Sequence, residues 1–321
     1  MPRRPAAAPP ALALDPLAGT PYRSIAAIGR GGMGEVVEAE HRALGKTVVV
    51  KLLQRDLMHR PDVVDRMRLE GQTLARLEHQ NLVAVIDLQV TLEGRPYLVM
   101  ERLRGRTLRD ELAQRGALPA AEAIDLARQA LAGLGAAHEA GIVHRDVTLA
   151  NLFLCDPRPG TTTRVLKLLD FGLAKVVSSA GGRAPRPLAA STEEGLTLGT
   201  PRFFSPEQAA GERVDARTDL YAMGIVLYTM VAGRGPFADL VAVADLLEAH
   251  QSTTPPRPSI HAPHPLPEGL EEVIARAMAK RPDDRFADAA SFARALDLPR
   301  RPGPRWASTE PMPPIRARRQ V

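Results

Sequence analysis

The sequence pattern changes near residue 102, and this change limits the fold more than any other feature. Before it, segments rich in β-branched and aliphatic residues alternate with Gly, Asn or charged turns, as strands do. We expect strands at 22–29, 35–40, 47–53, 82–90 and 96–101, with a helix at about 62–78. From Thr107 onward the pattern becomes helical. Strands followed by helices predict an α+β chain with two lobes.

The second part of the chain has clear helix boundaries. Residues 120–140 follow Pro119 and stop at Gly141, as a helix with a glycine stop does. Residues 219–232 are apolar on nearly every side and end at Gly233, which predicts a helix inside the core. Further helices are expected at 240–250, 268–280 and 287–296.

Composition sets the outer limits. Residues 1–21 are rich in Pro and Ala, and residues 299–321 in Pro and Arg, so we expect disorder at both ends. The lobes are then expected at 22–101 and 102–298. The single cysteine, Cys155, excludes an internal disulfide. No uncharged apolar run reaches ~18 residues, so we expect no membrane span and a cytoplasmic protein.

A glycine-rich loop lies between the first two expected strands. Residues 29–36 fit the pattern G-x-G-x-x-G-x-V, with Gly29, Gly31, Gly34 and Val36 at the fixed positions. Such glycines let backbone N–H groups approach phosphate oxygens. A dinucleotide site would continue into a helix, whereas residues 35–40 alternate as a strand does. A flexible hairpin without a ligand remains an alternative.

Lys51 interrupts an apolar strand, so its ammonium group lies at an edge or needs an anionic partner. In the following helix Glu70 shares one face with Met67, Leu74 and Leu77. A carboxylate on a buried face needs a cation, and Lys51 is the candidate. A structural ion pair without a ligand is the alternative interpretation.

Two short segments supply oxygen atoms suited to phosphoryl transfer. The first is His-Arg-Asp-Val-Thr-Leu-Ala-Asn at 144–151, and the second is Asp-Phe-Gly at 170–172. Asp146 can accept a proton from an attacking hydroxyl group. Asn151 and Asp170 offer the hard oxygen ligands that Mg²⁺ or Mn²⁺ prefers.

These motifs, in this order, resemble those of bacterial eukaryotic-like (Hanks-type) serine/threonine protein kinases over about residues 22–297. The resemblance implies the two-lobed protein-kinase fold and transfer of the γ-phosphoryl group of ATP to Ser or Thr hydroxyls of proteins. It implies catalytic roles for Asp146, Lys51, Glu70 and Thr200, and metal ligation by Asn151 and Asp170. It also implies autophosphorylation of the activation segment, within a possible transient homodimer.

The same resemblance assigns the ATP pocket and the regulatory residues. The expected ATP-binding residues are Ile28, Gly29, Gly31, Gly34, Val36, Lys51, Met100, Glu101, Leu103 and Asp110. Met100 takes the gatekeeper position. Ser191, Thr192 and Thr197 are candidate phosphorylation sites, and a phosphate there could pair with Arg145. Glu207 is expected to pair with Arg285, and Asp219 to support the catalytic loop.

One position departs from the kinase pattern. Serine/threonine kinases usually carry lysine where this chain has Thr148, so one cation of the transition state is missing. A pseudokinase that binds nucleotide with little or no transfer is therefore the alternative. The net charge of +5 raises the further option of a nucleic-acid binder, but aromatic residues make up only 4% of the chain. We expect no nucleic-acid partner.

Overall fold

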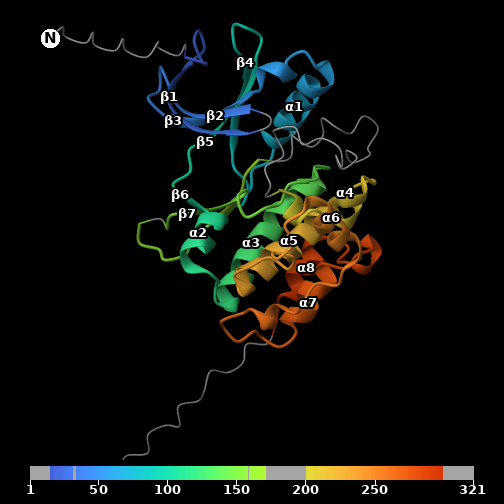
Figure 1. The fold of residues 1–321 in the computed structure, drawn as a ribbon. Helices are drawn as coiled ribbons and strands as arrows, with labels where there is room; N and C mark the ends of the chain where they lie inside the picture. The colour runs from blue at the N-terminus through green and yellow to red at the C-terminus, as the bar shows by residue number, and fades with distance from the viewer. Residues whose placement is uncertain (1–14, 32–33, 158, 171–199, 299–321) are drawn as a thin grey trace, which may run out of the picture.

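The structure is a computed structural model that describes residues 15–31, 34–157, 159–170 and 200–298. Its first lobe is a five-stranded antiparallel sheet in the order β1-β2-β3-β5-β4 (Figure 1). The strands are β1 (Tyr22–Gly31), β2 (Gly34–His41), β3 (Thr47–Leu53), β4 (Val85–Val90) and β5 (Pro96–Glu101). One helix, α1 (Pro61–Leu74), packs beside β4.

Three expectations for this lobe need correction. The fourth strand begins at Val85, because Leu82 instead forms a parallel bridge with Leu168 of the other lobe. Helix α1 ends at Leu74 rather than near residue 78. Residues 15–21, expected to be disordered, pack against the sheet, since Leu17 is fully buried in the same cluster as Tyr22.

The second lobe is mainly helical, with a small sheet at the side that faces the first lobe (Figure 1). That sheet has the order β6 (Gly105–Thr107), β7 (Leu152–Cys155) and β8 (Leu166–Leu168). The helices are α2 (Leu108–Arg115), α3 (Ala120–Glu139), α4 (Pro206–Ala210), α5 (Ala216–Ala232), α6 (Val243–Ser252), α7 (Leu270–Ala277) and α8 (Ala289–Ala295).

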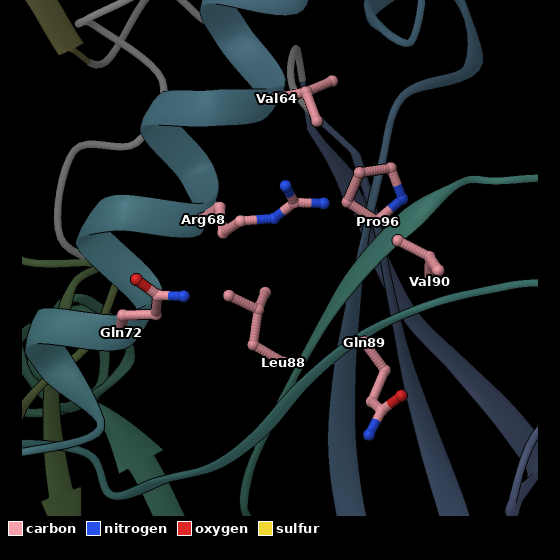
Figure 2. Close-up of a pocket in the computed structure, with 7 residues that line it drawn as sticks. All are labelled: Val64, Arg68, Gln72, Leu88, Gln89, Val90 and Pro96. Carbon is pink, nitrogen blue, oxygen red and sulfur yellow. The ribbon is translucent and has the colours of Figure 1, made fainter.

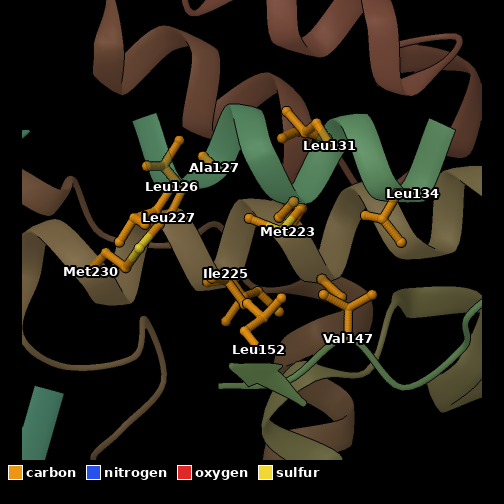
Figure 3. Close-up of a cluster of buried hydrophobic side chains, with 14 of the residues drawn as sticks. Leu126, Ala127, Leu131, Leu134, Val147, Leu152, Met223, Ile225, Leu227 and Met230 are labelled. Carbon is orange, nitrogen blue, oxygen red and sulfur yellow. The ribbon is translucent and has the colours of Figure 1, made fainter. Parts of the chain in front are cut away.

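Helix α5 forms the centre of this lobe, as its apolar sequence predicts. It packs against α3 and α7, and every residue from Thr218 to Ala232 is buried. Figure 3 shows Leu134 of α3 and Met223 of α5 between these two helices. Gly133 of α3 allows β8 to approach closely, because a Cβ there would lie 2.7 Å from Leu168 Cδ1. Among the described residues, no helix is long and apolar enough to cross a membrane.

Candidate active site

Buried apolar side chains anchor the segment at 144–151 in the helical core. Val147 is 1% exposed and Leu152 is fully buried, and both side chains point toward α5 in Figure 3. The apolar side chains therefore fix the backbone that carries Asp146 and Asn151. Those two residues are only half-buried, so they remain accessible from outside the core.

Asp219 of α5 binds the backbone of this segment through hydrogen bonds. Its Oδ2 accepts the His144 N–H at 2.8 Å, and its Oδ1 accepts the Arg145 N–H at 2.7 Å. His138 of α3 contacts Oδ2 through Nε2 at 2.7 Å. The support expected from Asp219 is thus confirmed, although the part played by His138 was not anticipated. A polar residue in the last turn of an apolar helix was the only signal for it.

Two residues with side chains adopt the left-handed backbone region, and both belong to this site. Arg145 has φ 62° and Asp170 has φ 44°, and no other non-glycine residue in the described segments has positive φ. Such conformations cost on the order of 1–3 kcal/mol each and persist where the surroundings enforce them. Strain of this kind is concentrated at functional sites, which supports an active site here.

Hydrogen bonds join the two polar segments to each other. The Leu169 N–H donates to the Asn151 carbonyl at 2.8 Å, and His144 Nε2 contacts the Leu169 carbonyl at 2.8 Å. Asn151 Nδ2 donates to the Asp146 carbonyl at 2.8 Å and to Asp146 Oδ2 at 3.0 Å. Asp146 and Asn151 are therefore in direct contact, and Asp170 follows the residue that is bonded to Asn151.

Lys51 of β3 reaches from the first lobe into this site. Its Nζ lies 2.8 Å from Asp170 Oδ1, and the lysine side chain is 14% exposed. Burial favours a raised pKa for Asp170, but the charge and hydrogen bond of Lys51 outweigh it, so the pKa is lowered. Asp170 is thus held as a carboxylate. Glu70, the partner expected for Lys51, lies in α1, but its side chain is outside the described part of the structure.

The oxygen donors of the site suit a hard divalent cation bound together with phosphates. Because Asn151 uses its Nδ2 atom on Asp146, its Oδ1 atom is turned away from that contact and can ligate a metal. At Asp170, Lys51 contacts Oδ1, so Oδ2 is the carboxylate oxygen that can ligate a metal. Mg²⁺ is commonly held by one or two protein oxygens, substrate phosphates and water, which these two side chains fit.

The residues expected around ATP lie on the strands that border the site. Ile28 of β1 is 54% exposed, Met100 of β5 is 7% exposed, and Val36 lies opposite Lys51 in the sheet. Gly34 must be glycine, because a Cβ would lie 2.0 Å from the Leu52 carbonyl oxygen. Gly29 and Gly31 lie in β1, whereas the tip of the loop, 32–33, is outside the described residues.

The connection between the lobes carries the remaining nucleotide candidates. The Glu101 N–H already donates to the Ala84 carbonyl at 3.0 Å, so only its carbonyl could serve adenine. Its carboxylate binds Lys167 Nζ at 2.8 Å, a pair that sequence analysis missed because the residues are far apart in the chain. Asp110 Oδ2 accepts a hydrogen bond from the Thr107 hydroxyl at 2.6 Å. Leu103 is half-buried just after β5.

Several expected residues cannot be placed. Phe171, Gly172, Ser191, Thr192 and Thr197 lie outside the described residues. Thr200 begins a short 3-10 helix, Thr200–Phe203, but its side chain is not described.

The expected pair of Glu207 and Arg285 is confirmed. Arg285 NH1 and NH2 donate to the two oxygens of Glu207 at 2.8 and 2.7 Å. The arginine side chain is 0% exposed and the glutamate side chain 5%. The pair links the start of α4 to the segment before α8.

A hollow between α1 and the strands β4 and β5 is distinct from this site. Figure 2 shows Arg68 and Gln72 of α1 facing Leu88 of β4 across it. Its volume is ≈ 260 Å³, and none of the residues expected to bind ATP or metal lines it.

Comparisons with known proteins agree with this geometry. Residues 22–296 match the model of the family described as "Protein kinase domain". The chain is 39% identical over 297 residues to serine/threonine-protein kinase Pkn1 of Myxococcus xanthus, covering 92% of this chain and 41% of that protein. It is 36% identical over 291 residues to serine/threonine-protein kinase PknA of Mycobacterium tuberculosis, covering 88% of this chain and 63% of that protein.

Solved structures match as well. The kinase domain of PknI from Mycobacterium tuberculosis aligns with a TM-score of 0.65 at 26% identity, covering 89% of this chain and 98% of that chain. The chain spans only 41% and 63% of the length of the two curated relatives above.

Proposed function

Because the chain belongs to the protein kinase domain family, we propose that it transfers the γ-phosphoryl group of ATP to Ser or Thr hydroxyls of proteins. The observation that carries this proposal is the contact between Lys51 and Asp170, 2.8 Å apart and 119 residues apart in sequence. It joins the cation of the first lobe to the carboxylate of the second.

Each side chain then has a defined task. Lys51 neutralises and orients the α- and β-phosphates, aided by Glu70. Asp170 and Asn151 hold Mg²⁺, or Mn²⁺, which supplies charge neutralisation to the phosphates. Asp146 orients the acceptor hydroxyl and accepts its proton, and the amide of Asn151 keeps that carboxylate in position.

Backbone N–H groups at Gly29, Gly31 and Gly34 approach the phosphates, and the adenine binds at the connection near Glu101 and Leu103. By the same resemblance, Thr200 acts beside Asp146. Phosphorylation of Ser191, Thr192 or Thr197 pairs with Arg145 and orders the activation segment, in a transient homodimer. These roles rest on the family resemblance. The proposed cytoplasmic location and the lobe boundaries at 22–101 and 102–298 rest on composition and on the sequence pattern.

A labelled-ATP assay tests the proposal. The wild-type chain with Mg²⁺ is expected to label a generic Ser/Thr protein substrate and itself. Asp146→Asn and Lys51→Met are each expected to lower kcat by at least roughly 10²-fold. The first removes the general base, and the second removes the cation that contacts the phosphates. Phosphoamino-acid mapping should recover Ser and Thr. Equal labelling by wild type and Asp146→Asn, in folded proteins, would overturn the mechanism.

The metal ligands are tested separately. Asp170→Asn keeps the shape of the side chain but removes its charge, so we expect weaker Mg²⁺-dependent ATP binding. Calorimetry with ATP at several Mg²⁺ concentrations measures this effect. Nucleotide affinity that is the same with and without Mg²⁺ would contradict the roles of Asp170 and Asn151.

A further inference from the structure

A second hollow lies beside the segment that carries Asp146. It has a volume of ≈ 370 Å³, and its walls include Thr148, Leu149 and Ala150 of that segment. Phe203, Ile225 and Leu246 provide apolar surface from three other elements. The wall of the hollow therefore begins two residues after Asp146 in the chain and includes residues of α5 and α6.

Three arginines line this hollow, and no Asp or Glu does so among the described residues. They are Arg109 of α2, Arg202 of the short helix after Thr200, and Arg234, which follows α5. A substrate side chain that enters the hollow therefore meets cationic side chains and no carboxylate in its described lining.

The arginines are only weakly engaged by the protein itself. Arg234 pairs with Asp239, whose side chain is 86% exposed, and exposed pairs contribute little. Arg109 lies 3.7 Å from Asp110, and these side chains are 66% and 49% exposed. Arg202 donates to two backbone carbonyls at 3.4 Å. A carboxylate that enters the hollow can therefore compete for their guanidinium groups, which bind carboxylates with paired hydrogen bonds.

We propose that this hollow receives the side chain of an Asp or Glu that lies within three residues of the acceptor hydroxyl in the protein substrate. The proposal deepens the kinase function above and rests on it. Thr148 is two residues from Asp146, a span of at most ~7 Å. A substrate residue one to three positions from the acceptor spans ~3–10 Å and so reaches the hollow.

The same geometry disfavours basic substrates. A Lys or Arg side chain would bring a cation next to three guanidinium groups, with no carboxylate in the described lining to balance them. The apolar surface from Phe203 and Ile225 accommodates the methylene groups of a glutamate. Arg109, Arg202 and Arg234 are thus assigned as residues that determine specificity.

A peptide series tests this assignment. One serine acceptor in a neutral peptide is combined with Glu, Gln or Lys at each of the three positions before and after it. At one of these positions at least, we expect kcat/KM for Glu to exceed that for Gln by about tenfold, as for a partly exposed charged hydrogen bond. The gain should appear in KM, and Lys at that position should lower kcat/KM.

Charge reversal identifies the residues. Arg234→Glu and Arg109→Glu should each reduce the preference for the Glu peptide and raise kcat/KM for the Lys peptide. Arg294→Glu, at an exposed position on α8, is the matched control and should keep the wild-type preference. A Glu preference that survives both reversals would overturn the assignment. A phosphoserine peptide that outperforms the Glu peptide by more than tenfold would replace the carboxylate with a phosphate group.

Failure of the kinase function gives a different result. Fluorescence anisotropy measures binding of the same peptides without transfer. If no peptide is phosphorylated but the Glu peptide binds more tightly than the Lys peptide, the hollow is correct and the kinase activity is wrong. If peptides are phosphorylated regardless of charge, the kinase activity stands and the acidic preference is wrong.

Discussion

Removal of Arg285 tests the most completely buried ion pair of the described structure. Its guanidinium makes five hydrogen bonds: two to the Glu207 carboxylate and three to the backbone carbonyls of Ala279, Lys280 and Arg217. Glu207 also accepts the Thr218 hydroxyl at 2.6 Å. Arg285→Met keeps much of the side-chain volume but leaves a buried carboxylate and three carbonyls without this donor.

The expected cost follows from the charge that remains. Breaking a buried pair by removing one partner typically costs about 3–5 kcal/mol, since the other charge stays in the interior. For a domain of this size 1 kcal/mol shifts Tm by about 2–4 °C, so Arg285→Met should lower Tm by about 6–20 °C. The double variant Glu207→Gln/Arg285→Met should lose less, because no unpaired charge remains.

The effect should depend on pH in a defined direction. Burial raises the pKa of Glu207, but the hydrogen bonds and charge of Arg285 outweigh it, so the folded-state pKa lies below the usual value. The contribution of Glu207 is therefore present above the unfolded pKa and lost as the pH falls through the folded pKa. In Arg285→Met burial dominates and raises that pKa, so the variant gains stability as the pH falls from 7 to 5.

Thermal unfolding at pH 7 and at pH 5, followed by circular dichroism, measures both effects. We expect the deficit of Arg285→Met relative to wild type to be smaller at pH 5 than at pH 7. A deficit below about 1 kcal/mol at pH 7, or one that grows at pH 5, would show that Glu207 is not a buried charge held by Arg285.

Three further predictions concern single positions. Thr148→Lys should raise kcat or leave it unchanged, because it restores a cation near the γ-phosphate; loss of transfer in a folded variant would show that the Thr148 side chain is misplaced. In α3, Gly133→Ala should cost about 1–3 kcal/mol, since a Cβ would lie 2.9 Å from the Asn81 carbonyl oxygen. Gly135→Ala should instead stabilise by about 0.5–1 kcal/mol, because the nearest atom is at 3.6 Å, and chemical denaturation of both variants compares them. Burial, aided by the charge of Lys280, lowers the pKa of His250 to about 3, so stability should fall as the pH drops from about 6.5 toward 3, with a flatter slope in His250→Gln.

Local sequence patterns were enough to predict the helices and strands whose ends are marked by turn residues, Pro or Gly. Residues 47–53 and 96–101 match β3 and β5 to the residue, because their mostly apolar runs end at clear turns. The helix at 120–140 was correct within one residue, since Pro119 and Gly141 bound it. The family resemblance likewise located Glu207, Arg285 and Asp219, whose contacts the structure shows.

Contacts between residues far apart in the chain could not be predicted from such local patterns. The strand-like stretch at 82–84 could not be separated from β4 by composition, yet the Val83 N–H donates to Leu168 of β8 rather than extending the first sheet. Leu17 lies in a Pro- and Ala-rich segment that resembles a disordered end, but its burial depends on the sheet edge. Lys51 was recognised as needing an anion, whereas spacing along the chain pointed only to Glu70 and not to Asp170.

The backbone of the site is strained at Arg145, and a hydrogen bond from the core of the helical lobe holds it in place. Arg145 holds φ 62° while its N–H is fixed by Asp219, which is 1% exposed within α5. The buried side-chain oxygens of Asp219 are satisfied there, because two N–H groups and His138 contact them. A helix buried on every side therefore sets the backbone that presents Asp146. The Asp146 carboxylate keeps its position because Asp219, which binds the preceding backbone, is packed inside the core.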